Sequence, residues 1–271
     1  MCIQVGDDRD HEVLNKVGQA IGHLQALEKL RISTCSNRAG ESYDWEILVP
    51  ILRHVRQKIA LQIDRFRRLK PEDSILLARA IHGHPMITSF EHDEHFPYEC
   101  LDSLYSAVAT LPALESISLC GCNQRTTPED ESALSHPESL TALLQVPSLQ
   151  SVYFENFKFT PALCQATANA LMEGTAITKL EFAECSFSAE GSAVMMANGL
   201  SRNTSVSHVK VESSRDQALF GVLATALPSN STLRRLDLRW QDGDGDDDFA
   251  PVLLASAKNT GLRHLSLGAD R

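Results

Sequence analysis

The sequence predicts an open, right-handed α/β solenoid, with one parallel sheet on the concave face and helices on the convex face. The first observation is a motif in which an apolar residue is followed by apolar residues three and five positions later. This motif occurs nine times, about every 29 residues. An amphipathic stretch with helical spacing precedes it, so each period supplies a helix and a strand. The motif begins at Leu27, Lys58, Ile87, Leu114, Leu149, Ile177, Val206, Leu233 and Leu262.

A single repeat cannot bury the apolar stripe of its own helix, so the repeats stabilise one another only when stacked. The helices are expected over residues 11–23, 43–56, 72–83, 99–110, 138–145, 161–172, 189–200, 216–227 and 248–258. The second repeat is the poorest copy, since Lys58 stands at an apolar position and Leu61 and Ile63 carry the pattern. A ninth motif position also points inward and holds Cys35, Phe66, His95, Cys122, Phe157, Cys185, Ser214 and Gln241.

The turns between helix and strand repeat as well. Asn203-Thr-Ser-Val206 and Asn230-Ser-Thr-Leu233 are two copies, and Asn tolerates the left-handed backbone that ends a helix. With the 29-residue period, these turns make the chain resemble the ribonuclease-inhibitor class of leucine-rich repeats over about residues 11–271. That class also occurs in NOD-like receptors and Ran GTPase-activating proteins. The resemblance implies the fold and leaves the function open, because the class serves unrelated partners.

We expect one leucine-rich-repeat domain over residues 1–271, because a solenoid grows by repeats. Residues 1–26 are expected to form an N-terminal helix and cap. The longest gap between motifs holds a polar segment, residues 123–139, which predicts a loop insertion. Such an insertion either contacts a partner or reflects tolerance of loop length.

The composition restricts the partners and the compartment. A formal net charge of −10 argues against binding nucleic acid and is compatible with a basic protein partner. No apolar run is long enough for a membrane span, so no membrane partner is expected. Seven cysteines without a secretory signal favour reduced thiols and a cytoplasmic location. Cys35, Cys122 and Cys185 are expected to be unpaired, because they fall in different repeats.

The C-terminal strand is followed by no polar capping repeat, which leaves an edge strand and part of an apolar layer open. Two explanations remain. Either the chain is a piece of a longer one, or another copy covers the edge by self-association.

No segment combines a nucleophile, a base and an oxyanion site, so we expect no enzyme activity and no cofactor. His82, His84, His92 and His95 lie near one another in sequence, but the repeat separates them, which favours structural histidines over a metal site. Cys120 and Cys122 are not expected to bind metal either. The acidic run over residues 242–248 does not match a calcium-binding loop, because it lacks Gly at the sixth position and Glu at the twelfth.

Strand residues between the inward ones face the concave side. The candidate partner-binding residues are Tyr153, Glu155, Glu181, Lys210, Glu212, Arg235, Asp237, Arg239 and Trp240. Beside Arg239, Trp240 has the composition of an interface hot spot, although a Trp folded over its neighbouring repeat explains it equally well. We therefore expect a non-catalytic protein–protein interaction module, or scaffold, that binds a partner on its concave face. The alternative, suggested by the family resemblance, is a GTPase-activating or other enzyme-regulating protein that acts through the solenoid rim.

Overall fold

A computed structural model of the chain describes residues 2–5, 11–34, 48–64, 71–92, 98–121, 137–212, 217–241 and 250–270. Its strands are β1 (Cys2–Val5), β2 (Lys29–Thr34), β3 (Ile59–Asp64), β4 (Ile87–His92), β5 (Ser116–Cys120), β6 (Ser151–Glu155), β7 (Lys158–Phe159), β8 (Lys179–Ala183), β9 (Ser186–Phe187), β10 (His208–Glu212), β11 (Arg235–Gln241) and β12 (His264–Asp270). Its helices are α1 (His11–Gly22), α2 (Leu48–Arg53), α3 (Pro71–Ile81), α4 (Tyr98–Val108), α5 (Pro137–Leu144), α6 (Pro161–Glu173), α7 (Glu190–Arg202), α8 (Gln217–Ala226) and α9 (Ala250–Lys258).

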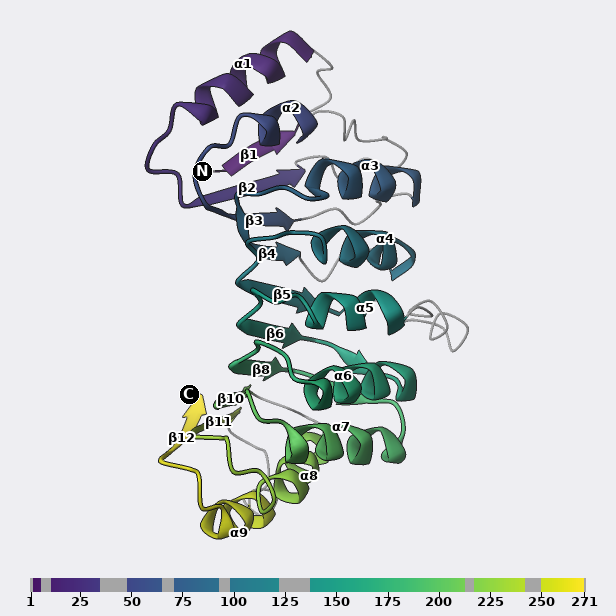
Figure 1. The fold of residues 1–271 in the computed structure, drawn as a ribbon, viewed down its shortest axis with the longest axis vertical. Helices are drawn as coiled ribbons and strands as arrows, with labels where there is room; N and C mark the ends of the chain where they lie inside the picture. Colours follow the sequence, from purple (N-terminus) through teal and green to yellow (C-terminus); the bar gives the residue numbers. More distant parts are fainter. Residues whose placement is uncertain are drawn as a thin grey trace. The chain divides into compact units, whose positions relative to one another are not determined.

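Helices and strands alternate, as the repeat predicts. The main sheet has the strand order β1-β2-β3-β4-β5-β6-β8-β10-β11-β12, and every pairing with a described register is parallel. The helices lie on one side of the strands in each part of the chain (Figure 1). The leucine-rich-repeat solenoid is thereby confirmed, and the described helix bounds fall within a few residues of those predicted. For α2 the comparison covers only its C-terminal end, which lies at Arg53 instead of residue 56, because residues 43–47 are outside the described part.

The chain divides into two compact units. Unit 1 comprises residues 1–117 and 122–148, and unit 2 comprises residues 118–121 and 149–271. The assignment of all 271 residues to a single domain stays a prediction. Among the helices within the described ranges, none is long and apolar enough to cross a bilayer.

Unit 1 begins with a strand that the sequence did not predict. β1 pairs in parallel with β2, with Ile3 opposite Ile32. The strand has only four residues and does not carry the apolar motif, so it lacks the periodic signal that marks the others. It adds a strand to the nine predicted from the motif, within the segment expected to form the N-terminal cap.

The poor second repeat has a structural counterpart in unit 1. Lys58 is exposed, and the neighbouring Ile59, which is 1% exposed, takes the inward position instead. The register between β3 and β4 shifts at this point, because Ile59 lies opposite Ile87 while Ala60 lies opposite Ser89. A bulge of this kind accommodates one extra residue and keeps the following apolar residues buried. Leu61 and Ile63 are accordingly 1% and 0% exposed.

Unit 2 contains a phenylalanine core between the sheet and the turns that follow the strands. Phe154 of β6 stacks on Phe182 of β8, with ring centroids 5.5 Å apart and an interplanar angle of 11°. Phe157 packs edge-on against Phe154 at 5.3 Å. Phe159 and Phe187, from the two-stranded sheet of β7 and β9, stack at 5.4 Å. Aromatic pairs in these arrangements add to the stabilisation that burial provides.

Three asparagines join consecutive repeats of unit 2 through side-chain hydrogen bonds. The side-chain Nδ2 of Asn203 donates to the Leu171 carbonyl at 2.7 Å, and its Oδ1 accepts from the Val206 N–H at 2.6 Å. Asn230 and Asn259 make the corresponding bonds one and two repeats later. Each asparagine therefore closes its own turn and satisfies carbonyl groups left open at the end of an earlier helix.

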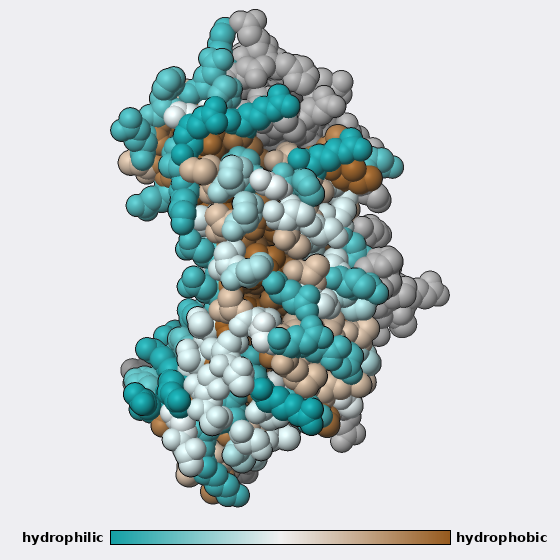
Figure 2. Space-filling view, viewed as in Figure 1, coloured by the Kyte–Doolittle hydropathy of each residue, from teal (hydrophilic) through white to brown (hydrophobic). Residues whose placement is uncertain are grey.

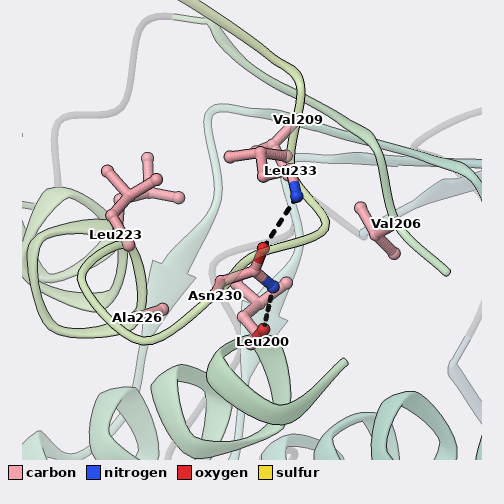
Figure 3. A pocket seen from close by; sticks show the side chains of 8 residues that line it. Leu200, Val206, Val209, Leu223, Ala226, Asn230 and Leu233 are labelled. Atoms are coloured by element: carbon pink, nitrogen blue, oxygen red, sulfur yellow. Dashed lines mark hydrogen bonds between the residues drawn. The ribbon is translucent and has the colours of Figure 1, made fainter. Parts of the chain in front are cut away.

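A small cavity of about 10 Å³ lies beside the second of these asparagines. Figure 3 shows Asn230 bonded to Leu200 on one side and Leu233 on the other, with apolar side chains around the space. Its lining consists of Leu200, Val206, Val209, Leu223, Ala226, Leu227, Asn230 and Leu233. The cavity is interior and mostly apolar, so we interpret it as a packing defect.

Several predictions concern side chains outside the described part of the chain. They include residues 123–136 of the loop predicted over residues 123–139, the acidic run, and Cys35, Phe66, His95, Cys122, Ser214 and Gln241. The last three residues of that predicted loop, 137–139, instead form the first turn of α5. Within the described part, Phe157 and Cys185 are each 1% exposed, as expected for the ninth motif position. Cys185 is a buried thiol, as are Cys100, Cys120 and Cys164.

Candidate functional site

Eight of the nine predicted contact residues have described side chains, and all eight lie on neighbouring strands of unit 2. Parallel pairing aligns them in rows that cross the sheet. One row runs through Tyr153, Glu181, Lys210 and Asp237. The next row runs through Glu155, Ala183, Glu212 and Arg239. The ninth residue, Trp240, lies within β11, and its side chain is outside the described part.

Oppositely charged side chains alternate across these rows. Lys179 Nζ lies 2.5 Å from Glu181 Oε1, and Lys210 Nζ lies 3.5 Å from Glu181 Oε2. Lys210 Nζ also lies 2.5 Å from Glu212 Oε1, which is 3.5 Å from Arg239 Nη1. The result is a continuous ion-pair network over β8, β10 and β11. Each pair contributes little stability at an exposed site, but together they restrict the side-chain conformations.

Tyr153 is the aromatic residue of the first row, and it is partly buried. Burial raises the pKa of its hydroxyl, and the nearby carboxylates of Glu155, Glu212 and Glu181 raise it further. The hydroxyl therefore stays protonated and available as a hydrogen-bond donor at physiological pH. A tyrosine with an apolar ring and a polar tip is a frequent anchor at protein interfaces.

Asp237 is less exposed than strand alternation alone predicts, since its side chain is only 9% exposed. Its Oδ2 accepts hydrogen bonds from Arg235 Nε and His208 Nε2, both at 2.8 Å. Burial by itself raises the pKa of Asp237, but the bonds and charges of Arg235 and His208 outweigh it, so the pKa is lowered. His264 lies on the other side, with its Nε2 3.9 Å from Asp237 Oδ1. Asp237 thus orients its neighbours rather than presenting a carboxylate to solvent.

Lys179 and His208 belong to this surface although the predicted contact set omits them. Both bind acidic residues of the set, at the distances given above. Their signal in the sequence is a motif position shared with Arg235, which belongs to the predicted set, and with His264. Strand alternation predicts that they face the concave side, but not which carboxylate each one contacts.

The histidines singled out from the sequence have structural roles where they are described. His92 is 1% exposed, and its Nε2 lies 3.3 Å from the Tyr105 hydroxyl. His84 Nε2 lies 3.0 Å from the Leu52 carbonyl, and exposed His82 lies beside Thr110. Across the described ranges, no three His, Cys, Asp or Glu side chains form a group suited to a metal ion.

No protein-family model matches the chain, and no curated protein matches it. Among solved structures, the chain is similar to the leucine-rich repeat-containing protein LegL7 from Legionella pneumophila. The two are 12% identical, with a TM-score of 0.51 over 100% of this chain and 91% of that one. At this level of identity the similarity shows the shared fold.

Proposed function

We propose that this leucine-rich-repeat solenoid is a non-catalytic protein-interaction module whose unit 2 holds the binding surface. The supporting observation is the aligned pair of side-chain rows across β6, β8, β10 and β11. These rows combine an aromatic anchor, Tyr153, with the ion-pair network defined above. The residues proposed to contact the partner are Tyr153, Glu155, Glu181, Lys210, Glu212, Arg235, Arg239 and Trp240. Asp237, the ninth residue of the predicted set, is proposed to act indirectly by holding Arg235 and His208 in position.

The physical argument is preorganisation. Binding costs less when the contacting side chains are already ordered in the free protein. Glu181 is 16% exposed and touches two lysines, while Lys210 is 22% exposed and touches two glutamates. Their backbones are fixed by the parallel sheet on both sides. A partner therefore meets a surface whose charged groups need little rearrangement.

We also propose that the partner is a basic protein, attracted over a distance by the chain's formal net charge of −10. Glu155 and Glu212 flank the small Ala183 in one row, and we propose that these two carboxylates receive a basic side chain of the partner. The same charge disfavours nucleic acid. A cytoplasmic location is part of the proposal, since a cytoplasmic environment keeps buried thiols reduced.

Self-association through the C-terminal edge is a separate proposal. In β11 the inward residues Leu236 and Leu238 are both 0% exposed, whereas Leu265 and Leu267 of β12 are 39% and 48% exposed. Elsewhere on the face of unit 2 seen in Figure 2, hydrophobic residues form small separate patches among hydrophilic ones. Light scattering over a range of concentrations tests this proposal, because a strict monomer excludes it.

The main experiment compares capture of proteins from cell extract by wild type, by a Tyr153→Ala variant and by an Arg239→Ala/Trp240→Ala double variant. Loss of a hot-spot residue typically costs at least about 2 kcal/mol, or roughly thirtyfold in affinity. Gln165→Ala on the exposed side of α6 is the control. Proteins captured by wild type and control, but lost from both variants, are then purified for affinity measurements.

Equal binding of every captured protein by wild type and by both folded variants would overturn the concave-face proposal. If substitutions outside the strand rows abolish binding instead, the alternative of an enzyme regulator that acts through the rim is favoured. A GTPase assay with the captured protein then separates regulation from simple binding.

A further inference from the structure

Unit 2 carries a concentration of positive charge where β11 and β12 begin. Arg234 and Arg263 occupy the same motif position in consecutive repeats, and Arg235 and His264 follow them directly. The backbone N–H of Arg263 donates to the Arg234 carbonyl at 2.9 Å, so the two strand starts are adjacent. We call these four residues the basic patch. It stands out in a chain whose formal net charge is −10.

Arg234 is held in place by the backbone of two turns. Its Nη1 donates to the carbonyl of Ser231 at 2.9 Å and to the carbonyl of Gly261 at 2.8 Å. A Cβ at Gly261 would collide with the backbone oxygen of Ser231, 2.6 Å away, and with the same Nη1 atom, so only glycine fits at this point of the turn. The guanidinium is therefore fixed before any ligand arrives, although the side chain lies at the exposed surface.

The positive charge of the basic patch exceeds the negative charge nearby. Asp237 is bound to Arg235 Nε, and it also accepts a hydrogen bond from His208. Among the residues that the structure describes, no carboxylate forms an ion pair with Arg234 or Arg263. Of the three guanidinium groups, only that of Arg235 binds a carboxylate, and those of Arg234 and Arg263 have no acidic partner in the described part of the chain.

We propose that the basic patch binds an acidic segment of a protein partner through its carboxylate groups. Planar guanidinium groups match carboxylates in geometry and form charge-assisted hydrogen bonds with them. A nucleic-acid ligand is disfavoured because the rest of the chain repels a polyanionic backbone. The patch lies at the strand starts, outside the two strand rows, and only Arg235 also belongs to the residues proposed to contact the concave-face partner. It therefore goes beyond the proposed function and is tested separately from it.

The test measures binding of a fluorescein-labelled hexaglutamate peptide by fluorescence anisotropy at 50 mM salt. An Arg234→Gln/Arg263→Gln double variant is expected to weaken binding at least tenfold. An Arg53→Gln/Arg79→Gln double variant changes the net charge equally, on exposed residues of α2 and α3, and is expected to stay within twofold of wild type. Raising the salt to 200 mM should weaken wild-type binding.

Arg234→Lys keeps the positive charge but loses the planar guanidinium group. Its affinity for hexaglutamate is expected to lie between those of wild type and the Arg234→Gln/Arg263→Gln variant. Unfolding curves for all variants check that each one is folded. The proposal is overturned if both double variants weaken binding equally, or if a single-stranded oligonucleotide binds as well as hexaglutamate. The Arg239→Ala/Trp240→Ala variant should retain the peptide, which separates failure of this proposal from failure of the concave-face proposal.

Discussion

His84 and Asn203 make equivalent hydrogen bonds at the same position of their own repeats. Each precedes its motif start by three residues and reaches a leucine carbonyl 32 positions earlier in the chain, Leu52 for His84 and Leu171 for Asn203. His84 Nδ1 accepts from the Met86 N–H at 3.3 Å, just as Asn203 Oδ1 accepts from the Ser205 N–H at 3.0 Å. Both bonds of His84 require a neutral ring with its proton on Nε2.

This equivalence predicts that asparagine can replace His84. His84→Ala removes a donor and an acceptor from a partly buried turn, so we expect a loss of about 1–3 kcal/mol in the free energy of unfolding. His84→Asn should recover most of it. Urea unfolding followed by circular dichroism measures both effects. His82→Ala is the control, because His82 is exposed and should change stability by less than about 0.5 kcal/mol. Equal losses for the Ala and Asn variants would contradict the equivalence.

The asparagines of unit 2 give a graded prediction. Asn230 donates to the carbonyls of Leu200 and Asn203 and accepts from the N–H groups of Thr232 and Leu233. Asn230→Ala loses both sets of bonds, while Asn230→Asp keeps the acceptor and loses the donor. We expect both variants to lose stability, by at least about 1 kcal/mol for the alanine. The Asn230→Asp variant should lose additional stability as the pH rises and its carboxyl group ionises, because the negative charge then lies beside the carbonyl oxygens of Leu200 and Asn203. A pH series of unfolding curves measures this loss.

The cavity beside Asn230 predicts opposite effects for two similar substitutions on β10. Val209 lines the cavity, whereas Val211 on the same strand does not. Val209→Ile adds a methylene group where space exists and should stabilise unit 2 by up to about 0.8 kcal/mol. Val211→Ile adds the same group where the side chain is 0% exposed and should destabilise by about 1 kcal/mol or more. Thermal unfolding of the two variants compares them directly. A destabilised Val209→Ile would show that the cavity cannot take the added group.

The buried thiols predict a loss of stability at alkaline pH. Burial raises the pKa of Cys164 and of Cys185 from 9.0 to about 12. The thiol form is thus favoured by folding, and its contribution is complete below pH 9 and lost as the pH rises from about 9 to about 12. The decline should approach roughly 1.4 kcal/mol per pH unit for each thiol.

Urea unfolding at pH 8, 9.5 and 10.5 measures this loss of stability. Cys164→Ala should show a shallower decline than wild type, and the difference between the two proteins removes the effect of other titrating groups. Parallel declines would show that Cys164 ionises equally in the folded and unfolded states.

The period of the motif was sufficient to predict the nine motif strands and the helices that precede them. It was insufficient for β1, because four residues carry no repeat, and for the bulge at Ile59, because a bulge depends on how two neighbouring strands fit together. At the candidate site, alternation correctly predicted which residues share a face. Burial of Asp237 and Asp64 was not predicted, because it depends on arginine and histidine side chains that cover them from adjacent repeats.

The asparagine bonds of unit 2 give its folding a direction. Each asparagine satisfies carbonyl groups of the preceding repeat, so a repeat is completed only after the one that follows it has formed. Loss of the last turn, with Asn259, exposes the carbonyls of Leu227 and Asn230 before any core residue of the earlier repeats is disturbed. Unfolding of unit 2 is therefore expected to start at the repeat of Asn259 and to proceed one repeat at a time toward that of Asn203. In hydrogen exchange, the amides of β12 should exchange before those of β11, and those of β11 before those of β10.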